Sequence, residues 1–275
     1  MEKELLRKLQ LTELEIAKEV KRICDENGIN YFMDSGTLLG AVRHKGFIPW
    51  DDDMDFGFLR EDYEKFIKIA PKCLKDEYIL QTWESDPYYP WAYSKVRKKD
   101  TLFVENMIVK AKHHMGVFVD LFPYDAYPDN KKDQKKHGRK IMRYRYIMLM
   151  KSNMTPWKGK KSALKKVAVF LKYKFYAFLG VFYNREKLIK KYDELMKKFN
   201  DIETEYVYEQ SGNARYGKWI VPKKCFDSYA QLEFEDTKFK APNEWDVYLK
   251  TTFGDYMKLP PEDKRKTHNP VEIKL

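Results

Sequence analysis

The chain has 275 residues, with 53 Lys and Arg against 42 Asp and Glu, a net charge of +11 and 16% aromatic residues. This composition excludes a disordered chain, because the apolar and aromatic material suffices for a substantial core, and it indicates an anionic substrate, partner or surface. Cys24, Cys73 and Cys225 lie far apart without metal-like spacing, so they predict free thiols in a reducing compartment. The charged N-terminus lacks the pattern of a secretion signal, and we expect a cytoplasmic protein.

Apolar periodicity predicts the elements of the first half of the chain. Leu9, Ile16 and Val20 recur on one helical face, and Gly28 supplies a stop signal for that helix. A short strand at 29–33 and a turn into a short helix follow. Further along, we expect a strand at 53–59, a helix at 60–70 and strands at 78–83, 91–96, 101–104 and 115–121.

From residue 130 to 200 the pattern becomes helical and basic, with a break at 153–159. Strands at 231–234 and 238–240 and a helix at 245–253 follow. The predicted fold class is therefore α+β, a mixed sheet with packed helices and a basic helical lobe. We expect three regions: a catalytic core at 1–130, the basic helical insertion or lobe at 131–200, and a C-terminal part at 201–275 that completes the catalytic domain.

The most informative segment holds four carboxylates in the five positions 51–55. If residues 53–59 form a strand, Asp53 and Asp55 project from one face while Met54 points the other way. Two like charges in one small volume raise the carboxylate pKa values or bind a cation, and a hard divalent ion with oxygen ligands fits. A calcium-binding loop is a rival, but it needs glycine where Phe56 stands. We therefore predict a divalent metal site.

Gly36 and Thr37 precede an apolar run and predict a turn entering a short helix. Such a turn directs backbone N–H groups outward. Glycine lets an anion approach them closely, the threonine hydroxyl adds a donor, and the helix N-terminus favours negative charge. An ordinary structural turn is the alternative. A phosphate site beside metal carboxylates predicts nucleotide phosphate chemistry.

Asp120 is the single charge in the apolar segment 116–123. An isolated charge in a buried strand is costly unless it is paired or bound to a metal, so Asp120 is the candidate for a third metal carboxylate or a general base. A buried ion pair is the alternative. Asp125, just beyond Pro123, is expected in a turn.

Several side chains are candidates for binding the substrate. Arg43 lies between the phosphate turn and the carboxylates in sequence, so we expect it to lie near the site, and its planar guanidinium can grip phosphate in two places. Lys95 and Arg97 share one face of a predicted strand, with surface charge as the alternative for each. Trp50 can stack on a base or a choline-like cation, or fill a gap in the core.

The segment 34–57, with its Gly-Thr-Leu-Leu-Gly-Ala-Val-Arg and Ile-Pro-Trp-Asp-Asp-Asp-Met-Asp runs, closely resembles the LicD family of phosphorylcholine transferases, whose relatives include fukutin and fukutin-related protein. The resemblance continues at Val-Asp-Leu-Phe-Pro (119–123) and, more loosely, at 94–97 and 256–261. It therefore touches nearly the whole chain, although only the first block is long and specific.

The resemblance implies a nucleotidyltransferase-like fold and a Mg²⁺-dependent site, with Mn²⁺ as an alternative ion. It implies transfer of a phospho-alcohol, foremost phosphocholine, from a CDP-activated donor to a glycan hydroxyl in cell-surface polysaccharide, teichoic acid or lipopolysaccharide biosynthesis. In the matching positions, Asp53 and Asp55 are the paired metal carboxylates and Asp120 the third. Gly36 and Thr37 match the phosphate-binding turn.

The region 163–183 is apolar, but lysines at its centre argue against a membrane span. Two interpretations stay open: a basic helix at the surface of an anionic membrane, which would make a lipid-linked glycan the acceptor, or a lobe helix packed on the catalytic domain. Two other functions also remain. One is a sugar transferase that uses the Asp-x-Asp motif, and the other is a non-enzymatic binder of anionic lipid or nucleic acid. The clustered aspartates disfavour nucleic acid as a partner.

Overall fold

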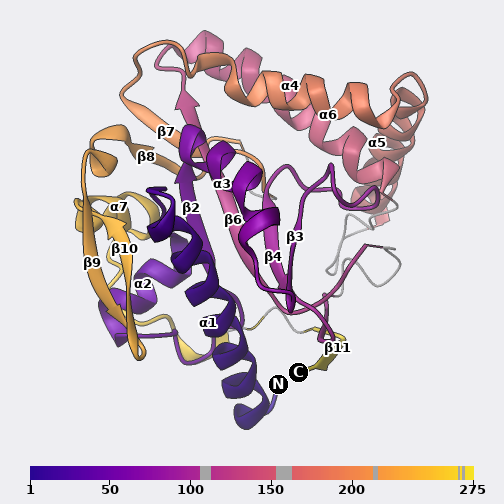
Figure 1. Ribbon diagram of the computed structural model, residues 1–275. Helices are drawn as coiled ribbons and strands as arrows, with labels where there is room; N and C mark the ends of the chain where they lie inside the picture. Colours follow the sequence, from indigo (N-terminus) through magenta and orange to yellow (C-terminus); the bar gives the residue numbers. More distant parts are fainter. Residues whose placement is uncertain (106–112, 153–162, 213–215, 266, 268–269) are drawn as a thin grey trace.

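A mixed sheet with helices packed against it forms the centre of the computed structural model, so the predicted α+β class is confirmed (Figure 1). The structure describes residues 1–105, 113–152, 163–212, 216–265, 267 and 270–275. The α-helices are α1 (Lys3–Glu26), α2 (Ser35–His44), α3 (Arg60–Cys73), α4 (Lys131–Lys151), α5 (Ala163–Val181), α6 (Arg185–Met196) and α7 (Trp245–Phe253). The strands are β1 (Phe32–Met33), β2 (Asp55–Leu59), β3 (Tyr78–Gln81), β4 (Ser94–Lys98), β5 (Leu102–Val104), β6 (Phe118–Tyr127), β7 (Tyr206–Glu209), β8 (Ile220–Pro222), β9 (Tyr229–Phe234), β10 (Thr237–Pro242) and β11 (Glu272–Lys274).

Among the described residues, the main sheet has seven strands, and β6 lies at its centre. The strand order is β1-β2-β6-β4-β3, while β7 pairs with the second half of β6 and β8 pairs with β7. β2 and β6 run parallel, and the remaining pairs are antiparallel. The C-terminal region therefore adds strands to the same sheet that the N-terminal region begins.

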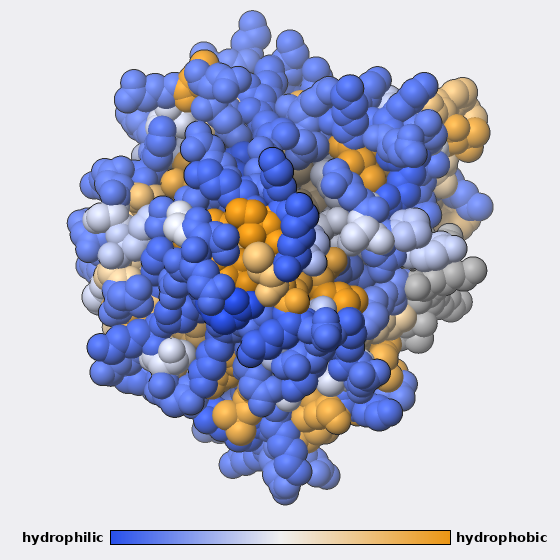
Figure 2. All heavy atoms as spheres, in the orientation of Figure 1, coloured by the Kyte–Doolittle hydropathy of each residue, from blue (hydrophilic) through white to orange (hydrophobic). Residues whose placement is uncertain are grey.

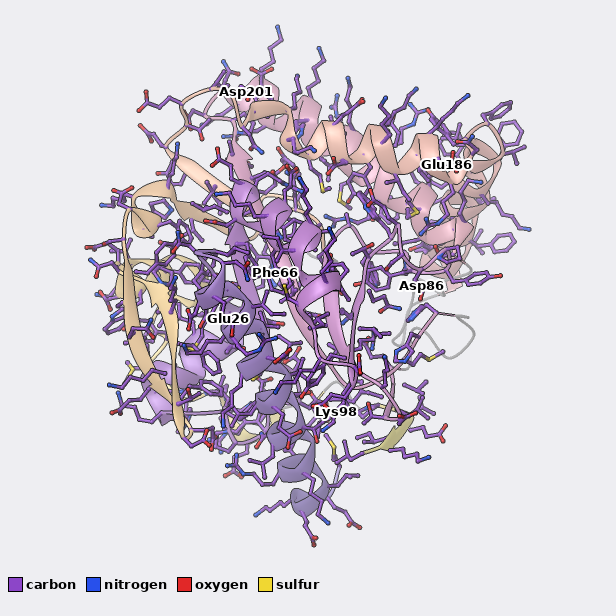
Figure 3. All side chains as sticks on the ribbon, in the orientation of Figure 1. Glu26, Phe66, Asp86, Lys98, Glu186 and Asp201 are labelled. Carbon is purple, nitrogen blue, oxygen red and sulfur yellow. The ribbon has the colours of Figure 1, made fainter. Side chains whose placement is uncertain are left out.

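Alternation along the strands gives the sheet one apolar face and one face with charged residues. Val119 and Leu121 of β6 and Phe56 of β2 are fully buried in the main core. They share this core with the apolar side of α1 and with Phe66 of α3 (Figures 1 and 3). Because successive side chains point to opposite faces, residues 55, 95 and 120 emerge on the side away from this core.

The central strand β6 is longer than predicted and runs through Pro123. The Asp120 N–H donates to the Met54 carbonyl on the β2 side, 2.9 Å away. Backbone N–H groups alternate sides, so the Pro123 nitrogen faces the other side. On that side β6 pairs with β4 as far as Leu121 and with β7 from Tyr124, so Pro123 falls at the change of partner and removes no ladder bond.

The expectation that Asp125 lies in a turn was therefore wrong. Asp125 lies in β6, is 1% exposed and accepts two hydrogen bonds from Arg60, at 2.8 Å and 2.6 Å. Asn200 and Gln210 donate to the same carboxylate. Burial opposes its ionisation, but the charge and hydrogen bonds of Arg60 outweigh burial and hold the pKa of Asp125 below its usual range.

Helices α4, α5 and α6 form a lobe around a second core, which residues 83–93 before β4 also join. Asn130 and Asn184 cap α4 and α6 by accepting backbone N–H bonds, which explains why helical structure begins at these residues. Ile141 and Met148 of α4 and Leu188 of α6 are fully buried in this second core. The predicted break at 153–159 lies outside the described residues. Among the described helices, none is both long and apolar enough to cross a bilayer.

Candidate active site

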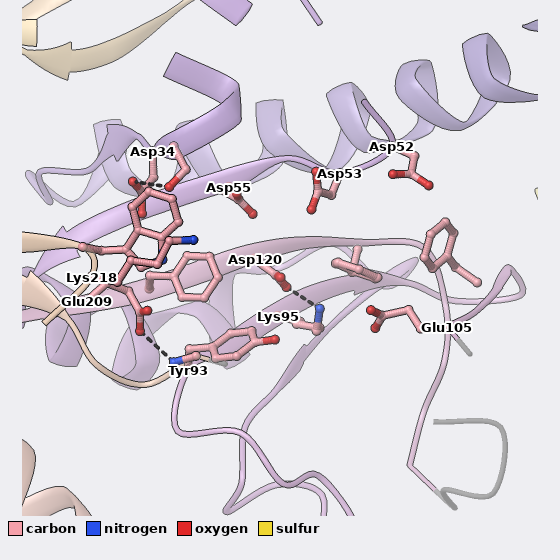
Figure 4. A pocket seen from close by; sticks show the side chains of 16 residues that line it. Asp34, Asp52, Asp53, Asp55, Tyr93, Lys95, Glu105, Asp120, Glu209 and Lys218 are labelled. Carbon is pink, nitrogen blue, oxygen red and sulfur yellow. Dashed lines mark hydrogen bonds and ion pairs between the residues drawn. The ribbon is translucent and has the colours of Figure 1, made fainter. Parts of the chain in front are cut away.

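Three charged residues form one row across the charged face of the sheet. Asp55 at the start of β2 is the register partner of Asp120 in β6, and Asp120 is the register partner of Lys95 in β4. The Lys95 Nζ lies 2.5 Å from an Asp120 carboxylate oxygen (Figure 4). Lys95 is buried, and its ammonium group also lies 3.2 Å from the centre of the Phe118 ring. Asp120, the predicted third carboxylate, therefore lies beside Asp55. It also forms a buried ion pair, which was the alternative role considered for it.

The acidic loop before β2 brings further carboxylates to this row. One carboxylate oxygen from each of Asp51, Asp52 and Asp53 lies within 4.8 Å of the other two. Asp53 and Asp55 line the same pocket, although β2 begins only at Asp55. Burial, followed by the charges of Asp53 and Asp120, raises the pKa of Asp55 well above its ordinary value. A bound divalent cation would relieve this repulsion.

A buried glutamate lies beneath the acidic loop. Gln10 of α1 donates to the Asp51 carbonyl at 2.9 Å, which places α1 under the loop. One turn further along α1, Glu13 is 1% exposed, and its Oε2 has no hydrogen-bond partner among the described residues. Burial and then the charge of Asp53 raise the pKa of Glu13 well above its ordinary value. The unpartnered Glu13 oxygen and the three loop aspartates concentrate negative charge here, and such a concentration favours a hard cation.

The row forms the floor of a pocket of about 480 Å³ (Figure 4). Among the described residues, seven carboxylates but only two lysines line it: Asp34, Asp52, Asp53, Asp55, Glu105, Asp120, Glu209, Lys95 and Lys218. Its aromatic walls come from Tyr93, Phe103, Phe118, Phe122 and Trp219. The carboxylates of this pocket would repel a phosphate group, and a bound cation would offset that repulsion. The aromatic faces, with the carboxylates, also suit a quaternary ammonium group.

The predicted phosphate turn has a different geometry from the one expected. α2 begins at Ser35, which lines the pocket, whereas Gly36 and Thr37 do not. The Thr37 hydroxyl accepts the Asp55 backbone N–H at 2.8 Å and so holds the start of β2. A Cβ atom on Gly36 would lie 2.8 Å from an Asp51 carboxylate oxygen, so the missing side chain makes room for the acidic loop. Phosphate binding by Gly36 and Thr37 stays a prediction.

Three other predicted substrate residues do not line the pocket. Arg43, near the end of α2, donates to the Tyr256 carbonyl at 2.9 Å. Trp50 packs against the main core, and the Arg265 guanidinium lies 4.9 Å from its ring centre. Arg97 is fully buried and donates to Gln81 and to the Gly116 carbonyl, both at 2.5 Å. Of the two cations predicted on β4, Lys95 is the one that reaches the pocket.

Comparison with known proteins identifies the family. The family model described as "LicD/FKTN/FKRP, nucleotidyltransferase domain" matches residues 28–169, which include every carboxylate of the row and loop. The chain belongs to the LicD family. It is 31% identical over 278 residues to "Lipopolysaccharide cholinephosphotransferase LicD" of Haemophilus influenzae, covering 98% of this chain and 97% of that protein. It is 44% identical over 48 residues to human "Ribitol 5-phosphate transferase FKRP", covering 18% of this chain and 10% of that protein.

Sequence patterns did not predict several residues in the pocket of this LicD-family chain, or Glu13, which lies beneath the acidic loop. Glu13 had a readable signal, because it falls on the apolar face of the first helix between Leu9 and Ile16. Asp34 accepts hydrogen bonds from the buried Tyr124 and Tyr248 hydroxyls, and no local pattern indicates that pairing. Glu209 and Trp219 reach the pocket from β7 and from the segment before β8. Only tertiary pairing brings these late residues to the site.

Proposed function

We propose that this protein transfers a phospho-alcohol, foremost phosphocholine, from a CDP-activated donor to a glycan hydroxyl in a Mg²⁺-dependent reaction. The observation that supports it most is the acidic row and loop on one sheet face, in a chain similar along 98% of its length to a cholinephosphotransferase. The excess of carboxylates over lysines in the pocket supports both a divalent ion at the phosphates and a cationic choline group.

In this proposal Asp53 and Asp55 hold the ion, with Glu13 close behind them. When bound, Mg²⁺ would neutralise the negative charge of the donor phosphates. Lys95, whose ammonium is held by Asp120, donates to an oxygen of the transferred phosphate. Asp120 accepts the proton of the acceptor hydroxyl or joins a second ion, and burial raises its pKa to about 6, which suits a base near neutral pH.

The bonds of the reaction follow from these roles. The acceptor oxygen forms a bond to the phosphorus that carries the alcohol, and the bond from that phosphorus to the CMP oxygen breaks. CMP leaves, and the hydroxyl proton goes to a carboxylate. The carboxylates, Lys95 and the aromatic walls therefore bind, orient and neutralise, and no covalent enzyme intermediate is required.

A panel of CDP-choline, CDP-ethanolamine, CDP-glycerol and CDP-ribitol tests the proposal. Each donor is incubated with the protein and candidate glycans, in Mg²⁺ or in EDTA, and CMP is quantified by chromatography. We expect acceptor-dependent CMP release that requires the metal, with CDP-choline as the best donor. Release of a nucleoside diphosphate from a nucleotide sugar would instead identify a sugar transferase. Polyanion binding without turnover, unaffected by loss of Asp53 and Asp55, would identify a non-enzymatic binder.

A further inference from the structure

Helix α5 packs one side against the lobe and leaves the other side uncovered. Its Tyr173 and Tyr176 rings lie 6.1 Å and 5.1 Å from the Tyr146 ring of α4, measured between centroids. On the same side, Gly180 sits against Ile147 of α4. One side of α5 is therefore packed in the lobe, as one of the two interpretations of this helix expects. The opposite side is not explained by that packing.

Large apolar side chains gather on the other half of α5 and at Phe182, the residue that follows it. Each of the following is between 51% and 78% exposed, and together they are called the α5 apolar face: Val167, Phe170, Leu171, Phe175, Phe178, Val181 and Phe182. At about 100° per residue they fall within an arc of about 140°. Figure 2 shows apolar atoms at its upper right edge, where Figure 1 places the α5–α6 connection. A contiguous apolar surface of this kind marks an interaction site.

The part of the chain that contains this apolar face is strongly basic. Residues 131–183 contain sixteen Lys and Arg and one acidic residue, Asp133, so their net charge is +15. The net charge of the whole chain is +11, so the remaining residues together carry −4. Lys174 lies within the arc of the apolar face, and its ammonium stands 5.5 Å from the Phe170 ring centre. Lys172 flanks the face, and its ammonium lies 3.8 Å from the Tyr146 ring centre. Long lysine side chains can keep their charge at head-group level while the apolar face is buried.

We propose that α5 is an interfacial helix that inserts its apolar face into an anionic lipid bilayer without crossing it. The length and composition of α5 fit this role, because it is a helix of 19 residues with four lysines, no acidic residue and one exposed apolar face. The surface of α5 is the evidence for membrane docking. Only the purpose of docking, which is to bring the pocket to a lipid-linked acceptor, rests on the proposed function. A second copy of the chain is a poorer occupant, because a twofold contact would bring the two lysine-rich regions together.

Vesicle sedimentation with the full chain tests the proposal. The vesicles contain phosphatidylcholine alone or an equal mixture with phosphatidylglycerol. Wild-type protein should bind the anionic vesicles and lose most of this binding in phosphatidylcholine alone. Phe175→Gln/Phe178→Gln should bind anionic vesicles at least tenfold more weakly. Ile202→Gln/Val271→Gln, which alters two equally exposed apolar residues elsewhere, should bind like wild type.

A second readout separates docking from misfolding and from dimer formation. Phe178→Trp should lose fluorescence when brominated lipids replace ordinary lipids, more than wild-type protein does. Equal sedimentation of wild type and Phe175→Gln/Phe178→Gln would overturn the proposal. So would light scattering that finds a wild-type dimer and a monomeric variant. Metal-dependent CMP release by wild type with a soluble acceptor is measured separately, so vesicle binding without CMP release refutes the proposed function and leaves the docking intact.

Discussion

Asp55 and Asp120 are direct partners in the parallel pairing of β2 with β6, so their carboxylates emerge side by side on one face of the sheet. Asp120 also meets the Lys95 ammonium, whereas Asp55 faces Asp53 and the rest of the acidic loop. The two aspartates therefore differ in electrostatic surroundings. Asp55 lies among like charges, which supports the proposed cation site, and Asp120 lies between Asp55 and a lysine.

Replacing Asp55 with asparagine should abolish transfer and leave the fold intact. The amide keeps the shape of the side chain but removes a ligand charge, and loss of such phosphate-neutralising interactions lowers turnover about 100- to 1000-fold. In the absence of metal the variant should be at least as stable as wild type, because a buried charge next to like charges is removed. CMP release and thermal unfolding measure the two effects. Substantial residual turnover in Mg²⁺ would contradict the site.

Donor binding should depend on a divalent ion. Calorimetry with CDP-choline should show much weaker binding in EDTA than in Mg²⁺, because the carboxylate-rich pocket repels the donor phosphates. Mg²⁺ alone should stabilise the protein by up to about 3 kcal/mol at a hundredfold excess over its dissociation constant. Asp55→Asn should lose most of that stabilisation. Equal donor affinity with and without chelator would rule out metal-bridged binding.

Lys95 and Arg97 form a matched pair for testing substrate contact, because both are buried cations on the same face of β4. Lys95→Met should lower turnover strongly. It should also destabilise the fold by about 3 kcal/mol, since Asp120 then loses its buried partner. Arg97→Met should lower the free energy of unfolding but keep the turnover number of the folded fraction. Kinetics normalised by active fraction, together with urea unfolding, separate the two. Equal loss of turnover in both variants would argue against a specific role for Lys95.

The Arg60–Asp125 pair should make stability depend on acid pH. The pKa of Asp125 is lowered in the folded state, so its contribution is fully present above the unfolded value near pH 4 and is lost as pH falls through the lower folded value. Asp125→Asn should be less stable than wild type by about 3 kcal/mol at pH 7. The gap should narrow below about pH 4. Urea unfolding at pH 7 and pH 3 measures it, and a constant gap would contradict the assignment.

Local patterns predicted the parts of the site that depend on one strand. The two-residue spacing indicated that Asp53 and Asp55 lie together, and both line the pocket although Asp53 precedes β2. The isolated charge of Asp120 in an apolar run likewise indicated a role at the site. The Lys95 partner of Asp120 was not predicted, because cross-strand register is set by long-range pairing. Glu209 was missed for the same reason.

We expected Arg43 near the site because it is close to the aspartates in sequence, but it does not line the pocket. α2 is a helix that rises about 1.5 Å per residue, so Arg43 stands roughly 12 Å along the axis from Ser35. It contacts the C-terminal segment at Tyr256 instead. Trp50 beside the aspartates likewise turns to the core and to Arg265. A phosphate role for Arg43 therefore remains a prediction without support from the pocket geometry.

The change of partner at Pro123 has a consequence for biosynthesis. The second half of β6 pairs with β7, which is synthesised only after the whole helical lobe. The pocket residues Glu209, Lys218 and Trp219 belong to that late segment. A nascent polypeptide halted within the lobe would carry every aspartate of the proposed metal site yet lack one wall of the pocket. Catalytic competence should thus appear on the ribosome only after Trp219 has been synthesised.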